Sequence, residues 1–159
     1  MMNQKVILLA DDDIDDTEMF CEALLAIDNT IACHCAENGK ECLKILDGLA
    51  EQPQLIFLDL NMPVMNGWQC LQLLKADNRY KHIPVIMIST SSYQQEMDNA
   101  AQLGALCYFV KPSDFNHLSQ LLKIIVANIG AGLNDVIKHL QNDGSQYIYA
   151  CAEKKADNN

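Results

Sequence analysis

Short apolar runs alternate with segments of helical period along most of this 159-residue chain, and this alternation restricts the fold more than any other feature. The apolar runs have the length of strands, and the segments between them carry apolar residues three and four positions apart. We expect strands at residues 5–10, 30–36, 54–60, 84–89 and 106–110. We expect helices at residues 16–27, 39–52, 67–77, 93–104 and 113–129. The chain therefore consists of five successive strand–helix units.

Successive strand–helix units predict an α/β fold, because nearly continuous apolar strands are typical of a parallel sheet covered by helices on both faces. Five units are too few for an eight-stranded barrel, so we expect an open, doubly wound five-stranded parallel sheet. In such a sheet, ligands bind beyond the carboxyl ends of the strands. The length fits one domain, which we place at residues 4–129, followed by a short C-terminal extension at residues 130–159.

Composition excludes several classes of protein. Half of the residues are apolar, which suits a packed core and not a disordered chain. The net charge of −10 argues against nucleic-acid binding, because a phosphate-binding surface needs clustered Lys and Arg. No apolar run approaches the ~20 residues of a membrane span, and the first residues lack the features of a signal peptide. We therefore expect a cytoplasmic protein that contacts neither membrane nor nucleic acid.

The seven cysteines include no C-x-x-C motif, and most lie in apolar runs, where a free cysteine behaves as a small core residue. We expect no disulfide framework. The sequence Cys33-His34-Cys35 raises the alternative of a metal site. However, neighbours on a strand point to opposite faces, so His34 would point away from the two cysteines. Since two thiolates make only half of a zinc site, we favour buried core cysteines.

Polar residues follow four of the expected strands at the point where each strand ends. Asp11, Asp12 and Asp13 follow the first strand, and Asp59 interrupts the third. Ser89 ends the fourth strand, and Lys111 follows the fifth. Because the carboxyl ends of parallel strands meet at one edge of the sheet, we expect carboxylates, a hydroxyl group and an ammonium group to gather there.

Each of these groups has a chemical use. Several carboxylates together favour a hard cation such as Mg²⁺, which offsets their mutual repulsion. A carboxylate such as Asp59 can attack phosphorus, while a cation, a lysine and a hydroxyl group stabilise the phosphoryl oxygens. A simpler interpretation is that acidic residues cap the first helix, and we favour it for Asp15 and Asp16 but leave Asp13 open. Asp59 is harder to explain in this way, because a buried unpaired charge is costly.

The motifs around these residues resemble the receiver domain of two-component response regulators over roughly residues 4–128. They are the acidic pair after the first strand, LDLNMPVMNG around Asp59, PVIMIS ending at Ser89, and YFVKP on the last strand. The resemblance implies a flavodoxin-like sheet with strand order 2-1-3-4-5. The stretch PVIMISTSS and the tail are also similar to those of single-domain regulators paired with bacterial phytochrome-type kinases.

The resemblance implies a role for each matching residue. The implied Mg²⁺ ligands are Asp11, Asp12, Asp59 and the backbone carbonyl of Asn61, which leaves Asp13 as a bystander. Asp59 would accept the phosphoryl group, and Lys111 would pair with its oxygens.

The resemblance also implies a switch. Ser89 would bind the phosphoryl group, and Tyr108 would change rotamer as Ser89 moves. The bond before Pro112 is implied to be cis, which would orient the preceding lysine. Asn61 and Ser91 would flank the approach of hydrolytic water.

The resulting hypothesis is a stand-alone response regulator. A sensor histidine kinase would donate a phosphoryl group to Asp59 in the presence of Mg²⁺, and output would run through contact with an unknown protein. Such a protein is a switch that assists its own phosphorylation and dephosphorylation, and not an enzyme. One alternative is a phosphorelay intermediate that passes the group to a histidine phosphotransfer protein. Others are a metal-binding scaffold that is never phosphorylated and a haloacid-dehalogenase-like phosphatase built on Asp11 and Asp13.

The C-terminal extension begins with Gly130 and Gly132, which favour the end of a helix. Residues 133–142 carry the apolar stripe of an amphipathic helix, residues 146–152 fit either a short strand or a helical turn, and we expect a frayed end at residues 153–159. An isolated helix of about ten residues is not stable in water. We therefore expect the stripe to pack on its own domain, on a second copy in a homodimer, or on an output partner.

Overall fold

The computed structural model describes residues 4–143 and 146–151. Its sheet contains five parallel strands: β1 (Val6–Ala10), β2 (Ala32–Ala36), β3 (Leu55–Asp59), β4 (Val85–Ser89) and β5 (Cys107–Val110). A short additional strand, β6 (Ile148–Ala150), pairs with β5 in the antiparallel sense. The strand order β2-β1-β3-β4-β5-β6 confirms the predicted α/β fold with its order 2-1-3-4-5, extended by β6.

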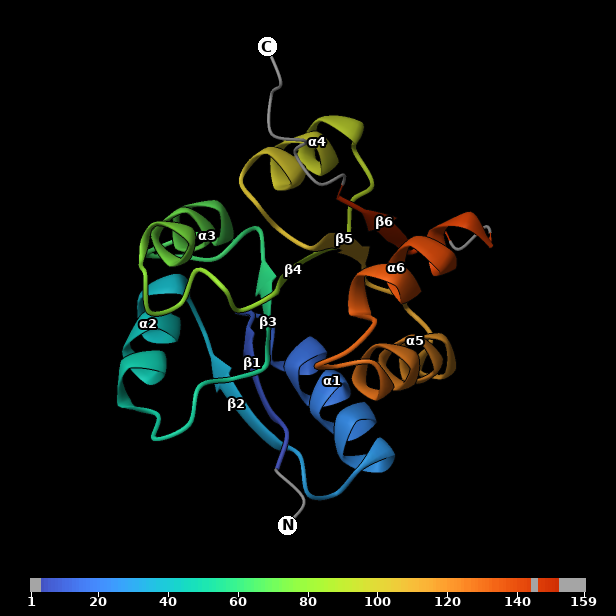
Figure 1. Cartoon of the computed structure of the whole chain (residues 1–159), viewed down its shortest axis with the longest axis horizontal. Coiled ribbons are helices and arrows are strands. Elements are labelled where there is room, and N and C mark those ends of the chain that lie inside the picture. The colour runs from blue at the N-terminus through green and yellow to red at the C-terminus, as the bar shows by residue number, and fades with distance from the viewer. Residues whose placement is uncertain (1–3, 144–145, 152–159) are drawn as a thin grey trace.

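Helices cover both faces of this sheet (Figure 1). In the described residues they are α1 (Ile14–Ile27), α2 (Gly39–Gly48), α3 (Gly67–Ala76), α4 (Gln94–Gln102), α5 (Phe115–Ala127) and α6 (Leu133–Asn142). Helices α1, α5 and α6 pack on one face, and α2, α3 and α4 pack on the other. The strands β1, β3 and β4 are buried along their whole length, which explains their continuous apolar sequence.

Capping side chains decide where two helices begin. Helix α1 starts at Ile14, two residues before the predicted start, because the Asp13 side chain accepts a hydrogen bond of 3.0 Å from the Asp16 backbone N–H. Helix α5 starts at Phe115 because the Asp114 side chain accepts from the backbone N–H of Asn116 at 2.8 Å. Other predicted elements were too long: the helix predicted at residues 39–52 ends at Gly48.

The tail lies against the sheet and helix α5. Ile137 of α6 is buried in the same core cluster as Ile148 of β6. The Val110 N–H donates to the Tyr147 carbonyl at 2.7 Å, and the Cys151 N–H donates to the Leu106 carbonyl at 3.2 Å, which joins β6 to β5. Packing of the stripe on its own domain is therefore observed, and the helical-turn alternative is wrong for residues 148–150. Residue 152 and the expected frayed end lie outside the described residues.

The seven cysteines differ in burial: three are buried, three are half-buried and one is exposed. Cys42, Cys70 and Cys107 are buried, as expected. The expectation of buried core cysteines is wrong for Cys35, which is exposed, and holds only in part for Cys33. The reason is that both lie on β2, an edge strand that the helices cover less completely than the central strands.

None of the helices in residues 4–143 and 146–151 combines the length and the apolar character needed to cross a membrane.

Candidate functional site

The carboxyl ends of β1 and β3 bring three carboxylates together, and we call Asp11, Asp12 and Asp59 the acidic pocket. Asp11 and Asp59 are buried, with 3% and 8% of their surface exposed, whereas Asp12 is exposed. One carboxylate oxygen from each residue lies within 4.8 Å of the others. The fold therefore places three oxygen donors at the predicted edge of the sheet.

Hydrogen bonds hold Asp11 in place. Its backbone N–H donates to the Ala36 carbonyl at the end of β2, at 2.9 Å. Its Oδ1 accepts from the Asp13 N–H at 3.0 Å, and its Oδ2 accepts from Lys111 Nζ at 2.7 Å. Both oxygens of Asp11 are thus engaged by the protein itself.

Lys111 supplies the cation of the site. Its Nζ lies 2.9 Å from an Asp16 oxygen and 3.7 Å from an Asp59 oxygen, in addition to its bond with Asp11. Burial alone would lower the pKa of Lys111, but the bonds to Asp11 and Asp16 outweigh it and raise this pKa above its usual value. The Lys111 side chain is therefore positively charged at neutral pH.

The contacts of Lys111 extend one expectation and correct another. Asp16 lies in the first turn of α1, as expected, but its carboxylate also pairs with Lys111, a contact that no local pattern marks because the fold brings Lys111 to it from the end of β5. The bond before Pro112 is not cis, because no described peptide bond is. Lys111 is oriented by its ion pairs and by its backbone N–H, which donates to the Ser89 carbonyl at 2.7 Å.

Asp59 has the most perturbed acid–base equilibrium of the pocket. Burial, which has the largest effect, and the Asp11 and Asp12 carboxylates together raise its pKa to about 7, against the opposing effect of the nearby Lys111 ammonium. At neutral pH the metal-free carboxylate is therefore near its midpoint. A cation bound beside it would favour the ionised form.

The loop after β3 contains Asn61 and returns close to the backbone of Asp59 at Gly67. The Gly67 N–H donates to the Leu60 carbonyl at 3.0 Å, and a Cβ at Gly67 would collide with the Asp59 carbonyl oxygen. Val64 lies in the left-handed region with φ of 67°. Asn61 itself is exposed and follows Asp59 by two residues.

A chain of hydroxyl groups begins at Ser89, at the end of β4. The Ser89 hydroxyl lies 3.1 Å from Ser91 Oγ and accepts from the Ser91 backbone N–H at 3.1 Å. The buried Tyr108 donates its hydroxyl to the Ser91 carbonyl and to Glu96, each at 3.0 Å. Ser91 Oγ also donates to Glu96. These hydrogen bonds thus connect the end of β4 with the first turn of α4. Glu96 takes part in them, although no sequence motif marked it.

A family model for the response regulator receiver domain matches residues 7–123, which is most of the chain. The chain belongs to this family. It shares 39% identity over 100 residues with the chemotaxis protein CheY1 of Helicobacter pylori strain J99, covering 63% of this chain and 76% of that protein.

Solved response regulators have the same fold. The phosphorylated cyanobacterial phytochrome response regulator RcpA aligns with a TM-score of 0.71 and 30% identity, over 76% of this chain and 90% of that one. The Mn²⁺-bound response regulator Rcp1 aligns with a TM-score of 0.67 and 28% identity, over 77% of this chain and 92% of that one. Membership of this family leaves the haloacid-dehalogenase-like alternative without support.

Proposed function

We propose that this receiver protein accepts a phosphoryl group on Asp59 from the phosphohistidine of a sensor histidine kinase, that it works in the cytoplasm, and that it signals through protein–protein contact. The observation that carries the proposal is the setting of Asp59. It is a buried carboxylate at the end of a central strand, with two carboxylates within 4.8 Å and an ammonium group 3.7 Å away.

In the transfer step, an ionised Asp59 oxygen attacks the phosphorus atom of the phosphohistidine. A P–O bond forms as the P–N bond breaks, and the imidazole keeps the electron pair of that bond and takes a proton from water. Lys111 stabilises the charge that gathers on the phosphoryl oxygens, because its Nζ already lies beside Asp59. The later loss of the group to water uses the same residues, and we place Asn61 and Ser91 beside the approaching water.

The acidic pocket fits Mg²⁺, because a small hard cation prefers carboxylate and carbonyl oxygens. We propose Asp12, Asp59 and the Asn61 carbonyl as direct ligands. Asp11 would act through a water molecule, since Lys111 and the Asp13 N–H already occupy its oxygens. When bound, the cation offsets the charges of the carboxylates and of the phosphoryl group. The similar regulator Rcp1 has a Mn²⁺-bound form, which supports the proposal that this chain binds a divalent cation.

The switch that we propose starts as a competition for the Ser89 hydroxyl. This hydroxyl now bonds with Ser91, and a phosphoryl group on Asp59 would draw it away. Ser91 would then be free to change its bonds with Tyr108 and Glu96, which hold the start of α4. Because Tyr108 is already buried, we expect the change to appear in its hydrogen bonds and in α4 before its ring moves.

The output surface that we propose includes the tail. Strand β6 pairs along β5, with Tyr149 opposite Tyr108, so a change at Tyr108 reaches the added strand directly. An output partner that distinguishes the two states of the switch would contact α4 and β6 together. The similarity to a phytochrome response regulator makes a phytochrome-type histidine kinase the first donor to test. Homodimerisation stays a prediction.

The test is phosphorylation by a small phosphodonor such as acetyl phosphate with Mg²⁺, followed by intact mass. We expect one added phosphoryl group that alkali removes. Asp59→Asn should abolish the addition, and Asp15→Asn, which alters an exposed carboxylate of α1, should leave it unchanged. Full phosphorylation of Asp59→Asn would contradict the proposal.

A further inference from the structure

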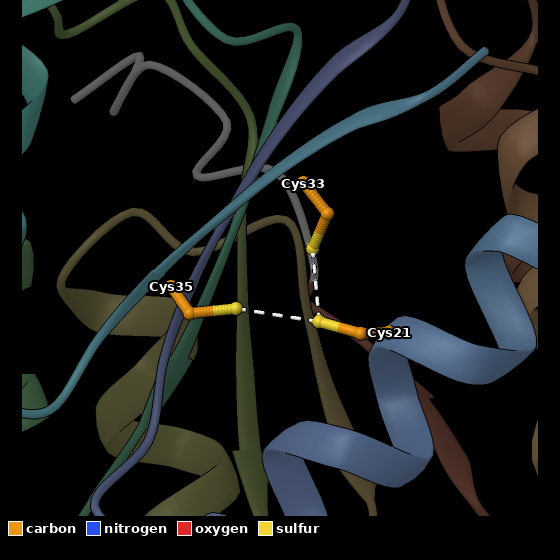
Figure 2. A group of neighbouring side chains, drawn as sticks. All are labelled: Cys21, Cys33 and Cys35. Carbon is orange, nitrogen blue, oxygen red and sulfur yellow. Dashed lines mark hydrogen bonds between the residues drawn. The ribbon is translucent and has the colours of Figure 1, made fainter. Parts of the chain in front are cut away.

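Three cysteines, one from α1 and two from the edge strand β2, meet where the helix lies against the strand. Figure 2 shows Cys21 pointing from α1 toward Cys33 and Cys35 on the strand. The Cys21 sulfur lies 3.4 Å from the Cys33 sulfur and 3.3 Å from the Cys35 sulfur. We call these residues the thiol cluster. Cys33 and Cys35 share a face of the strand, as their spacing in the sequence predicted, whereas the third sulfur, from the helix, was not predicted.

We propose that the thiol cluster is a binding site for a soft d¹⁰ metal ion, Cu⁺ or Zn²⁺, held by three thiolates. This site is separate from the acidic pocket and does not depend on the proposed phosphoryl transfer.

The geometry suits a metal ion. All three sulfurs lie within 4.8 Å of one another. Sulfurs bound to one tetrahedral Zn²⁺ at about 2.3 Å stand about 3.8 Å apart. The separations of the Cys21 sulfur from the Cys33 and Cys35 sulfurs, 3.4 Å and 3.3 Å, would need to lengthen only slightly to reach this value. A disulfide would instead require the sulfurs to approach to about 2.05 Å and would leave the third thiol over.

The chemistry of the donors selects the metal. Thiolates are soft ligands that favour Cu⁺ and Zn²⁺, whereas Mg²⁺ prefers oxygen. Within the part of the chain that the structure describes, the cluster comprises three thiols and no carboxylate or imidazole. Three thiolates complete a trigonal Cu⁺ site, and a tetrahedral Zn²⁺ site would add a water molecule, which can reach the exposed Cys35.

Metal binding would displace the thiol protons of the cluster. The Cys21 sulfur lies within hydrogen-bond distance of the Cys33 and Cys35 sulfurs, so the three thiols already share protons with one another. A metal ion held by three thiolates would take the place of these protons, which would pass to the buffer.

The test is metal titration of the full-length, reduced protein without oxygen, in excess Mg²⁺ so that the acidic pocket is occupied. Co²⁺ serves as the spectroscopic probe for Zn²⁺, because thiolate ligands give it a near-ultraviolet charge-transfer band that carboxylates do not. Cu⁺ is titrated against a chromophoric chelator. We expect one equivalent of Co²⁺ with this band, one equivalent of Cu⁺, or both, and stoichiometric binding in either arm shows that the cluster accepts that class of ion.

Variants decide whether the cluster is responsible. Cys35→Ser changes an exposed side chain and should leave the fold intact, and Cys21→Ser removes the shared sulfur. Each should weaken binding more than the roughly 10- to 100-fold expected for an outer-shell change. His34→Ala and Cys151→Ser are matched controls outside the cluster and should bind as the wild type does. The absence of a thiolate band together with no Cu⁺ binding, or equal binding by wild type and Cys35→Ser, would overturn the proposal.

Discussion

The acidic pocket and the thiol cluster each gather three potential ligand atoms within 4.8 Å, yet the protein surrounds them differently. The acidic pocket is enclosed by partners: Lys111 and the Asp13 N–H already engage Asp11, and Lys111 lies beside Asp59. Among the residues that the structure describes, the thiol cluster has only the hydrogen bonds between its own sulfurs, and it lies at an edge strand. This difference suits the two proposed roles: the acidic pocket would stabilise a reacting phosphoryl group, and the thiol cluster would only hold an ion.

The largest effect expected from this difference follows removal of the Lys111 ammonium group beside the acidic pocket. Lys111→Ala should slow phosphorylation of Asp59 by about 100- to 1,000-fold, the usual cost of losing one group that stabilises transition-state charge. Metal binding at the thiol cluster should not change. The measurement is the rate of phosphorylation by acetyl phosphate at saturating Mg²⁺.

The matched control is Lys123→Ala, because Lys123 is exposed on α5. It should phosphorylate at the wild-type rate. A loss of less than about threefold in Lys111→Ala would show that the acidic pocket does not use its lysine in this way.

The next effect is the pH dependence of Mg²⁺ binding. Burial raises the pKa of Asp59 to about 7, and the proton must leave before the carboxylate can bind the cation. Below pH 7, Mg²⁺ affinity should fall by up to about tenfold per pH unit, and above it the affinity should level off. Calorimetry from pH 5.5 to 8.5 measures this. An affinity that is constant across the range would contradict the assigned role of Asp59.

A smaller effect concerns the stability of the metal-free fold. Because the pKa of Asp59 is higher in the folded protein than in the unfolded chain, the folded state binds the extra proton between about pH 4 and pH 7. The contribution of Asp59 to the unfolding free energy should therefore fall as pH rises through this window. Asp59→Asn has no carboxylate to ionise, so its unfolding free energy does not fall in this way. It should exceed that of the wild type by about 1–3 kcal/mol at pH 8 and by much less at pH 5.

Urea unfolding of both proteins in a chelator at the two pH values provides the measurement. Cys35→Ser is a useful reference, since the thiol cluster lacks such a carboxylate and its variant should not share this pH dependence. An equal stability difference between wild type and Asp59→Asn at pH 5 and pH 8 would mean that Asp59 titrates normally.

The smallest effect concerns backbone strain beside the acidic pocket. Val64 is the non-glycine residue that the described chain places at positive φ, and its side chain is exposed. Val64→Gly should stabilise the fold by about 1 kcal/mol, because glycine adopts this conformation without a steric penalty. Leu73 is also exposed but lies in the helix α3, so Leu73→Gly should instead destabilise the fold. Destabilisation by Val64→Gly would show that the loop tolerates valine without strain.

The two regions also show what the sequence can predict. The acidic pocket depends on strand ends, and a parallel sheet brings its strand ends to one edge, so Asp11, Asp59 and Lys111 were identifiable from their positions alone. The thiol cluster depends on which turn of α1 faces β2, and that is a matter of helix rotation and packing. The pattern Cys33-His34-Cys35 therefore predicted the shared face of the two cysteines but not the approach of Cys21.

The same distinction applies to the tail. Its apolar stripe predicted α6, because helical spacing is a local property. It could not decide between a strand and a helical turn at residues 148–150, because β6 exists only through its pairing with β5. Glu96 was missed for a similar reason: its role comes from Tyr108 and Ser91, which the fold brings to it from elsewhere in the chain.

The most direct test of the central claim is to locate the phosphoryl group in the unmodified sequence. Borohydride reduces an aspartyl phosphate to homoserine, which peptide mass spectrometry can assign to one residue. Treatment with acetyl phosphate and Mg²⁺, followed by reduction and digestion, should place homoserine at position 59. Homoserine at position 11 or 12, or at no aspartate, would contradict the account.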